Sequence, residues 1–183
     1  MASSPTADNL GGRFVSIDLA ADALVLLIGI SASGKSTFAT RHFRPTEILS
    51  SDTLRSLVSD DPGDQQATDE AFELLHRLLD MRLRRGRLTV VDATNVQDWA
   101  RAPLIATSRR HRREVVAIIL DVPIAVANER NRARSGRRPP PAALRRQHRW
   151  LVDSLPSLPD EGVAAVHHLR SVEAVDGTVV NRP

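Results

Sequence analysis

The chain has 183 residues, of which 42% are hydrophobic, which fits one folded domain and excludes a large multidomain assembly. The 25 basic and 22 acidic residues nearly balance, which excludes disorder driven by a high net charge. Because the chain has no cysteine, disulfide scaffolds, thiolate metal sites and cysteine nucleophiles are also excluded.

The first residues differ in composition from the rest. Residues 1–12 are mostly small and polar and end in two glycines, so they are predicted to form a flexible tail before a single domain over 13–183. They lack the basic and apolar regions of a secretory signal, and no apolar run approaches the roughly 18 residues of a membrane span. We therefore expect a soluble, cytoplasmic protein with no membrane contact.

Short apolar runs predict the strands of a mainly parallel sheet. A short edge strand is expected at Phe14–Leu19, and the continuously apolar run Leu24–Ile28 is typical of a parallel strand buried on both faces. Helical patterns lie between several of these runs, so the sequence predicts a three-layer α/β/α fold with helices on both faces of the sheet. The later runs are Glu47–Leu49, Leu88–Val91, Val115–Leu120 and Val163–Leu169.

The clearest helix is predicted at Ala67–Arg85 and is expected to end at Gly86. Its apolar and charged residues separate onto two faces, as in a helix that covers a core. The expected buried stripe consists of Ala71, Leu74, Leu75 and Leu78, and the expected outward residues are Asp69, Glu73, Arg77 and Arg84.

Residues 29–36 read GISASGKS, which matches the P-loop pattern of a glycine, four residues, a second glycine, a lysine and a serine or threonine. The pattern follows a predicted strand and opens a predicted helix at Lys35–His42, so backbone N–H groups and the helix N-terminus would form a cradle for phosphate oxygens. The sequence therefore predicts that ATP, or another nucleoside triphosphate, binds here with Mg²⁺. The expected nucleotide-binding residues are Gly29, Ser31, Ala32, Ser33, Gly34, Lys35, Ser36 and Thr37.

Particular residues of this loop have distinct expected roles. Gly29 and Gly34 permit the tight turn, Lys35 reaches the β- and γ-phosphates, and Ser36 offers its hydroxyl to the metal. Lys35 is the only lysine of the chain. A GC-rich genome explains why arginine replaces lysine elsewhere, but it does not explain the lysine at the one position where the P-loop requires it.

Asp52 and Arg55 follow the strand predicted at Glu47–Leu49, at the sheet edge where ligands gather in open α/β folds. The carboxylate of Asp52 could accept the proton of an attacking hydroxyl, or it could simply cap the next helix, and position alone favours neither. Arg55, one helical turn later, could hold an anionic substrate or could be an exposed arginine without a partner.

Asp92 follows the strand Leu88–Val91, at a place where P-loop proteins commonly put an acidic residue near the metal. Thr94 and Asn95 come next in a polar turn, where capping of the loop explains them equally well.

Arginine is concentrated in the second half of the chain, where residues 101–149 hold 13 arginines against three acidic residues. Such asymmetry is typical of a protein that meets a polyanion such as a nucleic acid, although an arginine-rich composition also produces solvated basic patches. The run ANERNRARSGRRPPP begins as a helix and continues with Gly and Pro, which predicts a mobile, arginine-bearing lid over about 130–155. Arg130 and Arg134 are four residues apart and are expected to face the nucleotide together.

Four strings resemble the kinase domain of bacterial RNA-repair polynucleotide kinase over about Leu24–Leu155. They read LIGISASGKSTFA, PTEILSSDTLRSLVSDDPGDQQATDEAF, LTVVDATNVQDWARAPLI and NERNRARSGRRP. The resemblance implies a P-loop kinase that moves the γ-phosphate of ATP to the 5′-hydroxyl of RNA or DNA, in the end-healing step of nucleic-acid repair.

The resemblance also implies roles for individual residues. Lys35 and Ser36 would hold ATP and Mg²⁺, Asp52 would be the general base, and Arg55 would bind the substrate's adjacent phosphate. The remaining implied residues are the catalytic lid arginines Arg130 and Arg134, and Asp64 and Gln65 bordering the acceptor strand.

The sequence departs from this family in two ways. The family's enzyme continues into phosphatase and ligase domains, so we expect either a stand-alone kinase or an excised module that works with separate phosphatase and ligase partners. The lid also carries a triple proline at Pro139–Pro141. A homo-oligomer is left open.

Two other functions are kept as alternatives. A small-metabolite kinase on the same fold would use Arg55 to hold a sugar acid or a nucleotide in a closed pocket. A non-catalytic, ATP-responsive module that binds nucleic acid would need Lys35 but not Asp52.

Overall fold

The computed structural model of the chain describes residues 15–135 and 138–183. The tail predicted at 1–12 and the first residue of the edge strand, Phe14, lie outside the described residues. The strands are β1 (Ser16–Asp18), β2 (Leu24–Ile28), β3 (Ile48–Ser50), β4 (Thr89–Asp92), β5 (Val115–Leu120), β6 (Ala165–Leu169) and β7 (Val179–Asn181). The α-helices are α1 (Lys35–His42), α2 (Ser51–Ser59), α3 (Thr68–Arg84), α4 (Asp98–Arg110), α5 (Ile124–Ala133), α6 (Pro141–Ser154) and α7 (Val172–Asp176).

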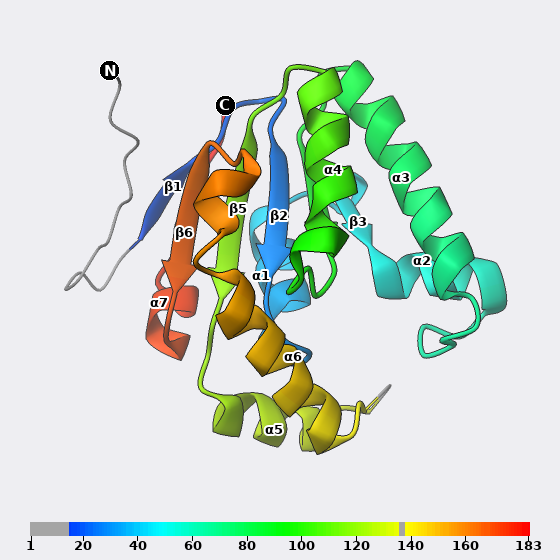
Figure 1. The fold of residues 1–183 in the computed structure, drawn as a ribbon, viewed down its shortest axis with the longest axis vertical. Helices are drawn as coiled ribbons and strands as arrows, with labels where there is room; N and C mark the ends of the chain where they lie inside the picture. Colours follow the sequence, from blue (N-terminus) through cyan, green and yellow to red (C-terminus); the bar gives the residue numbers. More distant parts are fainter. Residues whose placement is uncertain (1–14, 136–137) are drawn as a thin grey trace.

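The main sheet has five strands in the order β3-β4-β2-β5-β6, and every described pair in it is parallel. The strand arrows therefore all point toward one edge of the sheet, where α1, α2 and α5 begin (Figure 1). β2 lies at the centre and pairs with β4 on one side and with β5 on the other. The carboxyl ends of β2, β3 and β4 thus come together, which is the geometry that open α/β sheets use for ligands.

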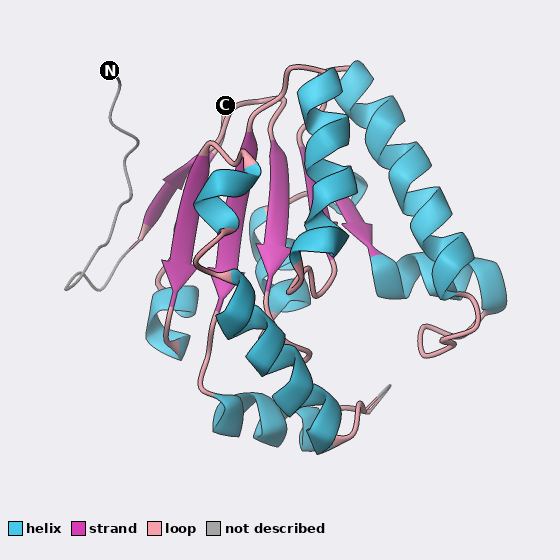
Figure 2. Cartoon of the chain, viewed as in Figure 1, coloured by secondary structure: helices cyan, strands magenta, loops and turns pink. Residues whose placement is uncertain are grey.

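Helices cover both faces of the sheet (Figure 2), so the predicted three-layer α/β/α fold is confirmed. Alternate residues of β2 point into opposite layers because side chains along a strand alternate. Leu24, Leu26 and Ile28 pack in the core under α3, α4 and the end of α6. Val25 and Leu27 pack in the other core, which includes residues of α1, α5 and α7.

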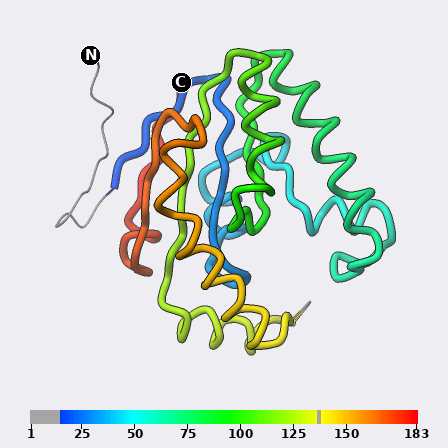
Figure 3. The backbone as a smooth tube through the Cα atoms, viewed as in Figure 1, coloured from blue at the N-terminus to red at the C-terminus, as the bar shows by residue number. Residues whose placement is uncertain are grey.

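The predicted edge strand is present, but it does not extend the main sheet. β1 pairs in parallel with β7, a strand that the sequence did not predict, in a separate two-stranded sheet. Figure 3 shows the end of the chain running beside β1. Ile17, at the middle of β1, is fully buried in the core on the α1 side, so this small sheet closes one end of that core.

Helix α3 forms as predicted, but its buried stripe differs. Its buried residues are Ala71, Leu75, Leu79 and Leu83, whereas Leu74 and Leu78 are 39% and 38% exposed. The spacing of four residues gives a narrow stripe, because α3 lies beside α2 and α4 at the rim of its layer rather than over the middle of the sheet.

Within the described part of the chain, no helix combines the length and the apolar character needed to cross a bilayer.

Candidate functional site

The loop between β2 and α1 has the backbone form expected of a P-loop. A β-carbon at Gly29 would lie 2.6 Å from the carbonyl oxygen of Leu120, so only glycine fits beside β5. Gly34 has a φ of 104°, in the region that favours glycine, and it leads directly into α1 at Lys35. These contacts explain why both glycines are needed and where the N–H groups of the helix terminus become available to an anion.

Lys35 is buried, with its ammonium group turned into the loop. Its Nζ donates hydrogen bonds to the carbonyl oxygens of Gly29 at 2.9 Å and of Ile30 at 2.8 Å. Burial lowers the pKa of Lys35 to about 8, although the carboxylates of Asp92 and Asp52 act in the opposite direction. The amine is therefore held where an arriving phosphate would stabilise its charge.

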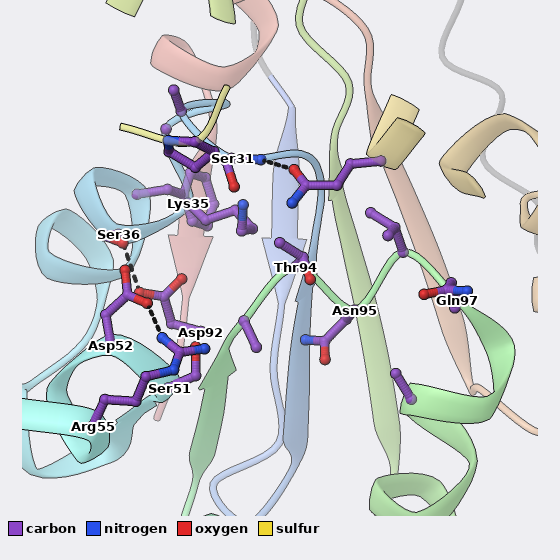
Figure 4. Close-up of a pocket in the computed structure, with 18 of the residues that line it drawn as sticks. Ser31, Lys35, Ser36, Ser51, Asp52, Arg55, Asp92, Thr94, Asn95 and Gln97 are labelled. Carbon is purple, nitrogen blue, oxygen red and sulfur yellow. Dashed lines mark hydrogen bonds and ion pairs between the residues drawn. The ribbon is translucent and has the colours of Figure 1, made fainter. Parts of the chain in front are cut away.

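Ser36 and Asp92 form the pair expected for a metal site. The Ser36 hydroxyl donates to Oδ2 of Asp92 at 2.8 Å, and Asp92 is only 5% exposed at the end of β4 (Figure 4). Burial raises the pKa of Asp92, while Lys35 nearby opposes the rise. A hydroxyl and a carboxylate are oxygen ligands that Mg²⁺ accepts alongside phosphate and water, so the residues fit the ion. Among the described residues, no three His, Cys, Asp or Glu side chains cluster into a metal site of their own.

Asp52 is not the cap of α2. Ser50 holds that position, and its side chain accepts from the N–H of Thr53. The carboxylate of Asp52 lies in the first turn of the helix and points toward the P-loop side of the cavity (Figure 4). The capping alternative for Asp52 is therefore wrong.

Arg55 is buried and has partners. Its Nη1 donates to Oδ1 of Asp52 at 2.5 Å, and its Nε donates to Thr68 of α3 at 3.3 Å. Only 7% of its side chain is exposed, so the expectation of an exposed, unpartnered arginine is wrong. Gln65, in the loop before α3, lines the same cavity, whereas Asp64 does not line it and accepts from the N–H of Gln66.

A cavity of about 880 Å³ joins these groups. The P-loop forms its middle, and most of the predicted nucleotide-binding residues line it, while Gly29 and Ser33 lie behind the surface. One side is formed by the helices beside β5 and β6, and the other by the helices that follow β3 and β4. The first side includes Arg130, Arg134, Pro139, Gln147, Val175 and Asp176, and the second includes Asp52, Arg55, Gln65, Thr68, Phe72, His76, Trp99 and Pro103.

The two predicted lid arginines reach this cavity. Nη1 of Arg130 donates to the carbonyl oxygen of Ser33 at 3.2 Å, and the charge of Arg134 acts on both Lys35 and Asp92. The triple proline stands where α6 begins, and the carbonyl oxygen of Pro139 accepts from Asn131 at 2.8 Å. The lid segment crosses residues 136–137, which lie outside the described residues.

Sequence reasoning missed Gln147 on α6. Its Oε1 accepts the backbone N–H of Ser31, inside the P-loop, at 2.8 Å. No motif marks a lone glutamine within an arginine-rich helix, so only the folded structure reveals that α6 touches the loop.

Asn95 and Thr94 support the P-loop from the side of β4. Nδ2 of Asn95 donates to the carbonyl oxygen of Leu27 at 2.8 Å, and the carbonyl oxygen of Thr94 accepts from the N–H of Gly29 at 3.0 Å. Of the two readings of this turn, these contacts favour the structural one.

The arginines that the structure describes within 101–149 do not all lie on one basic surface. Arg101 is buried and ion-paired with Glu161 at 2.5 Å. Arg110 pairs with Asp80, and Arg113 pairs with Asp22, both at the sheet edge opposite the P-loop. A count of charges along the sequence therefore overstates the basic surface near the cavity.

Comparison with known proteins identifies the family. A model of the AAA domain matches residues 24–154, more than half of the chain. This chain belongs to the AAA_33 family of AAA domains. No curated protein matches it.

This AAA domain also shares its fold with solved structures. A chain of the Pnkp1/Rnl/Hen1 RNA repair complex is 19% identical, with a TM-score of 0.64 over 82% of this chain and 48% of that one, so this chain spans about half of that protein's length. A sugar kinase from a Janibacter species is 21% identical, with a TM-score of 0.56 over 82% and 87% of the two chains. Kti12 from Chaetomium thermophilum, in complex with ADP-AlF3, is 17% identical, with a TM-score of 0.51 over 80% of this chain and 88% of that one. These likenesses establish a kinase-like P-loop fold.

Proposed function

We propose that this chain is an ATP-dependent polynucleotide kinase that phosphorylates the 5′-hydroxyl end of RNA or DNA, in the end-healing step of nucleic-acid repair. The observation that carries the proposal is the Asp52–Arg55 pair, 2.5 Å apart, in the same cavity as Lys35 and Ser36. A strand's 5′ end offers a hydroxyl to be deprotonated and a phosphate to be bound, and these are the groups that a carboxylate and a guanidinium recognise.

On the donor side, the P-loop N–H groups and the start of α1 would bind the phosphates of ATP. Lys35 would exchange the carbonyl oxygens of Gly29 and Ile30 for phosphate oxygens, which carry a full negative charge. Ser36 and Asp92 would hold Mg²⁺, which when bound neutralises charge on the β- and γ-phosphates.

On the acceptor side, Asp52 would act as the general base. The 5′-hydroxyl gives its proton to the Asp52 carboxylate while its oxygen attacks the γ-phosphorus in line. A new phosphorus–oxygen bond forms as the bond from the γ-phosphorus to the β–γ bridging oxygen breaks, and ADP leaves with that electron pair. Arg55 would orient Asp52 and, with its remaining N–H donors, bind the substrate's adjacent phosphate.

Arg130 and Arg134 would stabilise negative charge on the transferring group as part of a lid over about 130–155. Both line the cavity beside the P-loop, and Arg130 already contacts the backbone of Ser33. A closed lid would keep water from the γ-phosphate.

The similarity to a chain of an RNA repair complex is consistent with a nucleic-acid acceptor. We propose that phosphatase and ligase partners would carry out any 3′-end healing and sealing. We further propose that residues 13–183 act as one domain. The similarity to a sugar kinase keeps a small-metabolite acceptor as the alternative.

One assay tests the proposal. The protein is incubated with γ-labelled ATP, Mg²⁺ and either a 5′-hydroxyl RNA, the same DNA sequence or a panel of sugars and nucleosides, and each oligonucleotide with a 5′-phosphate serves as its matched control. We expect label on the 5′-hydroxyl oligonucleotides and none on their 5′-phosphorylated controls. Label on a small molecule alone would overturn the polynucleotide assignment, and nucleotide binding without any transfer would favour the non-catalytic module.

A further inference from the structure

The acceptor side of the cavity has an aromatic wall that the proposed chemistry does not use. Phe72 and His76 are four residues apart on α3, and Trp99 and Pro103 are four residues apart on α4. Residues at this spacing share one face of a helix, and α3 and α4 pack side by side (Figure 1). The two pairs therefore line the same cavity as Asp52 and Arg55, from two neighbouring helices.

Trp99 is unusually exposed for its size. It is one of two tryptophans in a chain without tyrosine, and 67% of it remains exposed in the first turn of α4. The other tryptophan, Trp150, lies under the guanidinium of Arg146, with the Arg146 Cζ 5.2 Å from the ring centroid. A large ring left open in a concave site is available to a flat ligand, since indole faces stack on nucleobases of any sequence.

The neighbouring groups favour a nucleobase that belongs to the acceptor. Burial lowers the pKa of His76, so its ring is neutral at pH 7 and adds an aromatic surface without a charge. Arg55 and Asp52, which line the same cavity, are paired with each other, and Asp69 of α3 also lines it. The sugar and phosphate of a terminal nucleotide would lie at this pair, and its base would lie at the aromatic wall.

We propose that Trp99, with Phe72 also lining the cavity, is the stacking platform for the 5′-terminal base of the acceptor strand. This inference rests on the proposed kinase function and deepens it, because it names the part of the substrate that selects a polynucleotide over a sugar. Base stacking on an aromatic side chain accounts for about five- to a hundredfold in binding.

The test compares two acceptors that differ only in the first base. One is a 5′-hydroxyl oligonucleotide, and the other has the same sequence with an abasic 5′-terminal nucleotide. Trp99→Ala is expected to lower kcat/KM about tenfold or more on the complete acceptor and to leave the abasic acceptor at its wild-type value. Trp99→Phe is expected to recover part of the loss, and the Kd for ATP should stay unchanged.

A matched control and a direct binding signal complete the test. Leu57 on α2 is 74% exposed and outside the cavity lining, so Leu57→Ala should behave as wild type on both acceptors. In a Trp150→Phe background Trp99 is the sole indole, and its fluorescence should be quenched by the complete oligonucleotide and not by the abasic one.

The outcomes separate the two proposals. If wild-type protein labels no oligonucleotide, the kinase function fails, and the stacking platform fails with it. In the other case, wild-type protein labels oligonucleotides, but Trp99→Ala lowers kcat/KM equally for the two acceptors or for neither of them. Only the stacking platform is then overturned.

Discussion

At the scale of single residues, the site depends on charged groups that the fold holds out of water. Lys35 is the clearest case, because its ammonium group is satisfied by two backbone carbonyl oxygens while burial reduces its affinity for the proton. A phosphate that binds beside it would supply negative charge and raise its pKa again. We therefore expect the binding of ATP to be coupled to the protonation of Lys35.

This coupling predicts a pH dependence. Below a pKa of about 8 the free protein already carries the ammonium, and above it ATP binding must include uptake of a proton. We expect the affinity for ATP to be flat up to about pH 7.5 and then to fall by up to about tenfold per pH unit. Titration calorimetry at pH 7, 8 and 9 measures the Kd for ATP at each pH.

Lys35→Arg is the control, because a guanidinium stays charged throughout this range. Whatever its absolute affinity, this variant should show no fall between pH 7 and 9. A wild-type affinity that does not change with pH would contradict the coupling.

The sequence predicted the P-loop residues well, because the spacing of Gly29, Gly34 and Lys35 is set by local backbone geometry. It did not separate the two roles of Asp52, since an aspartate at the helix cap and an aspartate two residues after the cap look alike in a sequence. The structure separates them because Ser50 takes the cap. The partners of Arg55 were also invisible, because Thr68 belongs to another helix.

At the scale of elements, α3 shows where a helical pattern stops being informative. The sequence correctly predicted the helix and the burial of Ala71 and Leu75. The four leucines at 74, 75, 78 and 79, however, fit two different buried stripes equally well. The neighbours of α3 decide between them: Leu79 is fully buried, and Leu78 is 38% exposed.

The two leucines make a matched pair for a stability test. Leu79→Ala should reduce the free energy of unfolding by about 2–5 kcal/mol, because it leaves a cavity in the core. Leu78→Ala, with the same change in helix propensity, should cost less than about 1 kcal/mol. Urea unfolding at pH 7 measures both free energies. Equal losses of stability in the two variants would contradict the assignment of Leu79, and not Leu78, to the buried face of α3.

Arg101 illustrates a second limit of sequence reasoning. It falls in the arginine-rich segment, yet it is 1% exposed and connects α4 to Glu161 and to the carbonyl oxygen of Asn95. These contacts support the turn that holds the P-loop. Composition predicts a solvated arginine here, and only the tertiary structure shows its burial.

At the scale of the whole molecule, the parallel sheet brings the ends of β2, β3 and β4 to one edge, and the cavity forms there. The common edge could be predicted, because alternating strands and helices make the strands parallel, whereas the strand order is known only from the structure. The extent of the basic surface could not be predicted, because arginines that are close in sequence end at opposite edges of the sheet, as Arg113 and Arg130 do.

Ligand binding at this edge should stabilise the whole fold. A ligand that binds only the folded state adds about 2.7 kcal/mol at a concentration of 100 times its Kd. For a chain of this length, ATP with Mg²⁺ should therefore raise the Tm by about 5–10 °C. Thermal unfolding of Lys35→Met should show little of this rise, whereas an equal rise in the variant would mean that ATP binds elsewhere.

The most direct test of the account is single-turnover phosphorylation of a 5′-hydroxyl oligonucleotide by Asp52→Asn. Asp60→Asn is its matched control, because Asp60 ends the same helix in a left-handed conformation that asparagine also adopts. We predict that Asp52→Asn binds ATP as wild type does and transfers phosphate at least about a hundredfold more slowly, while Asp60→Asn keeps the wild-type rate. Transfer at the wild-type rate by Asp52→Asn would contradict the central claim that this carboxylate takes the proton of the acceptor.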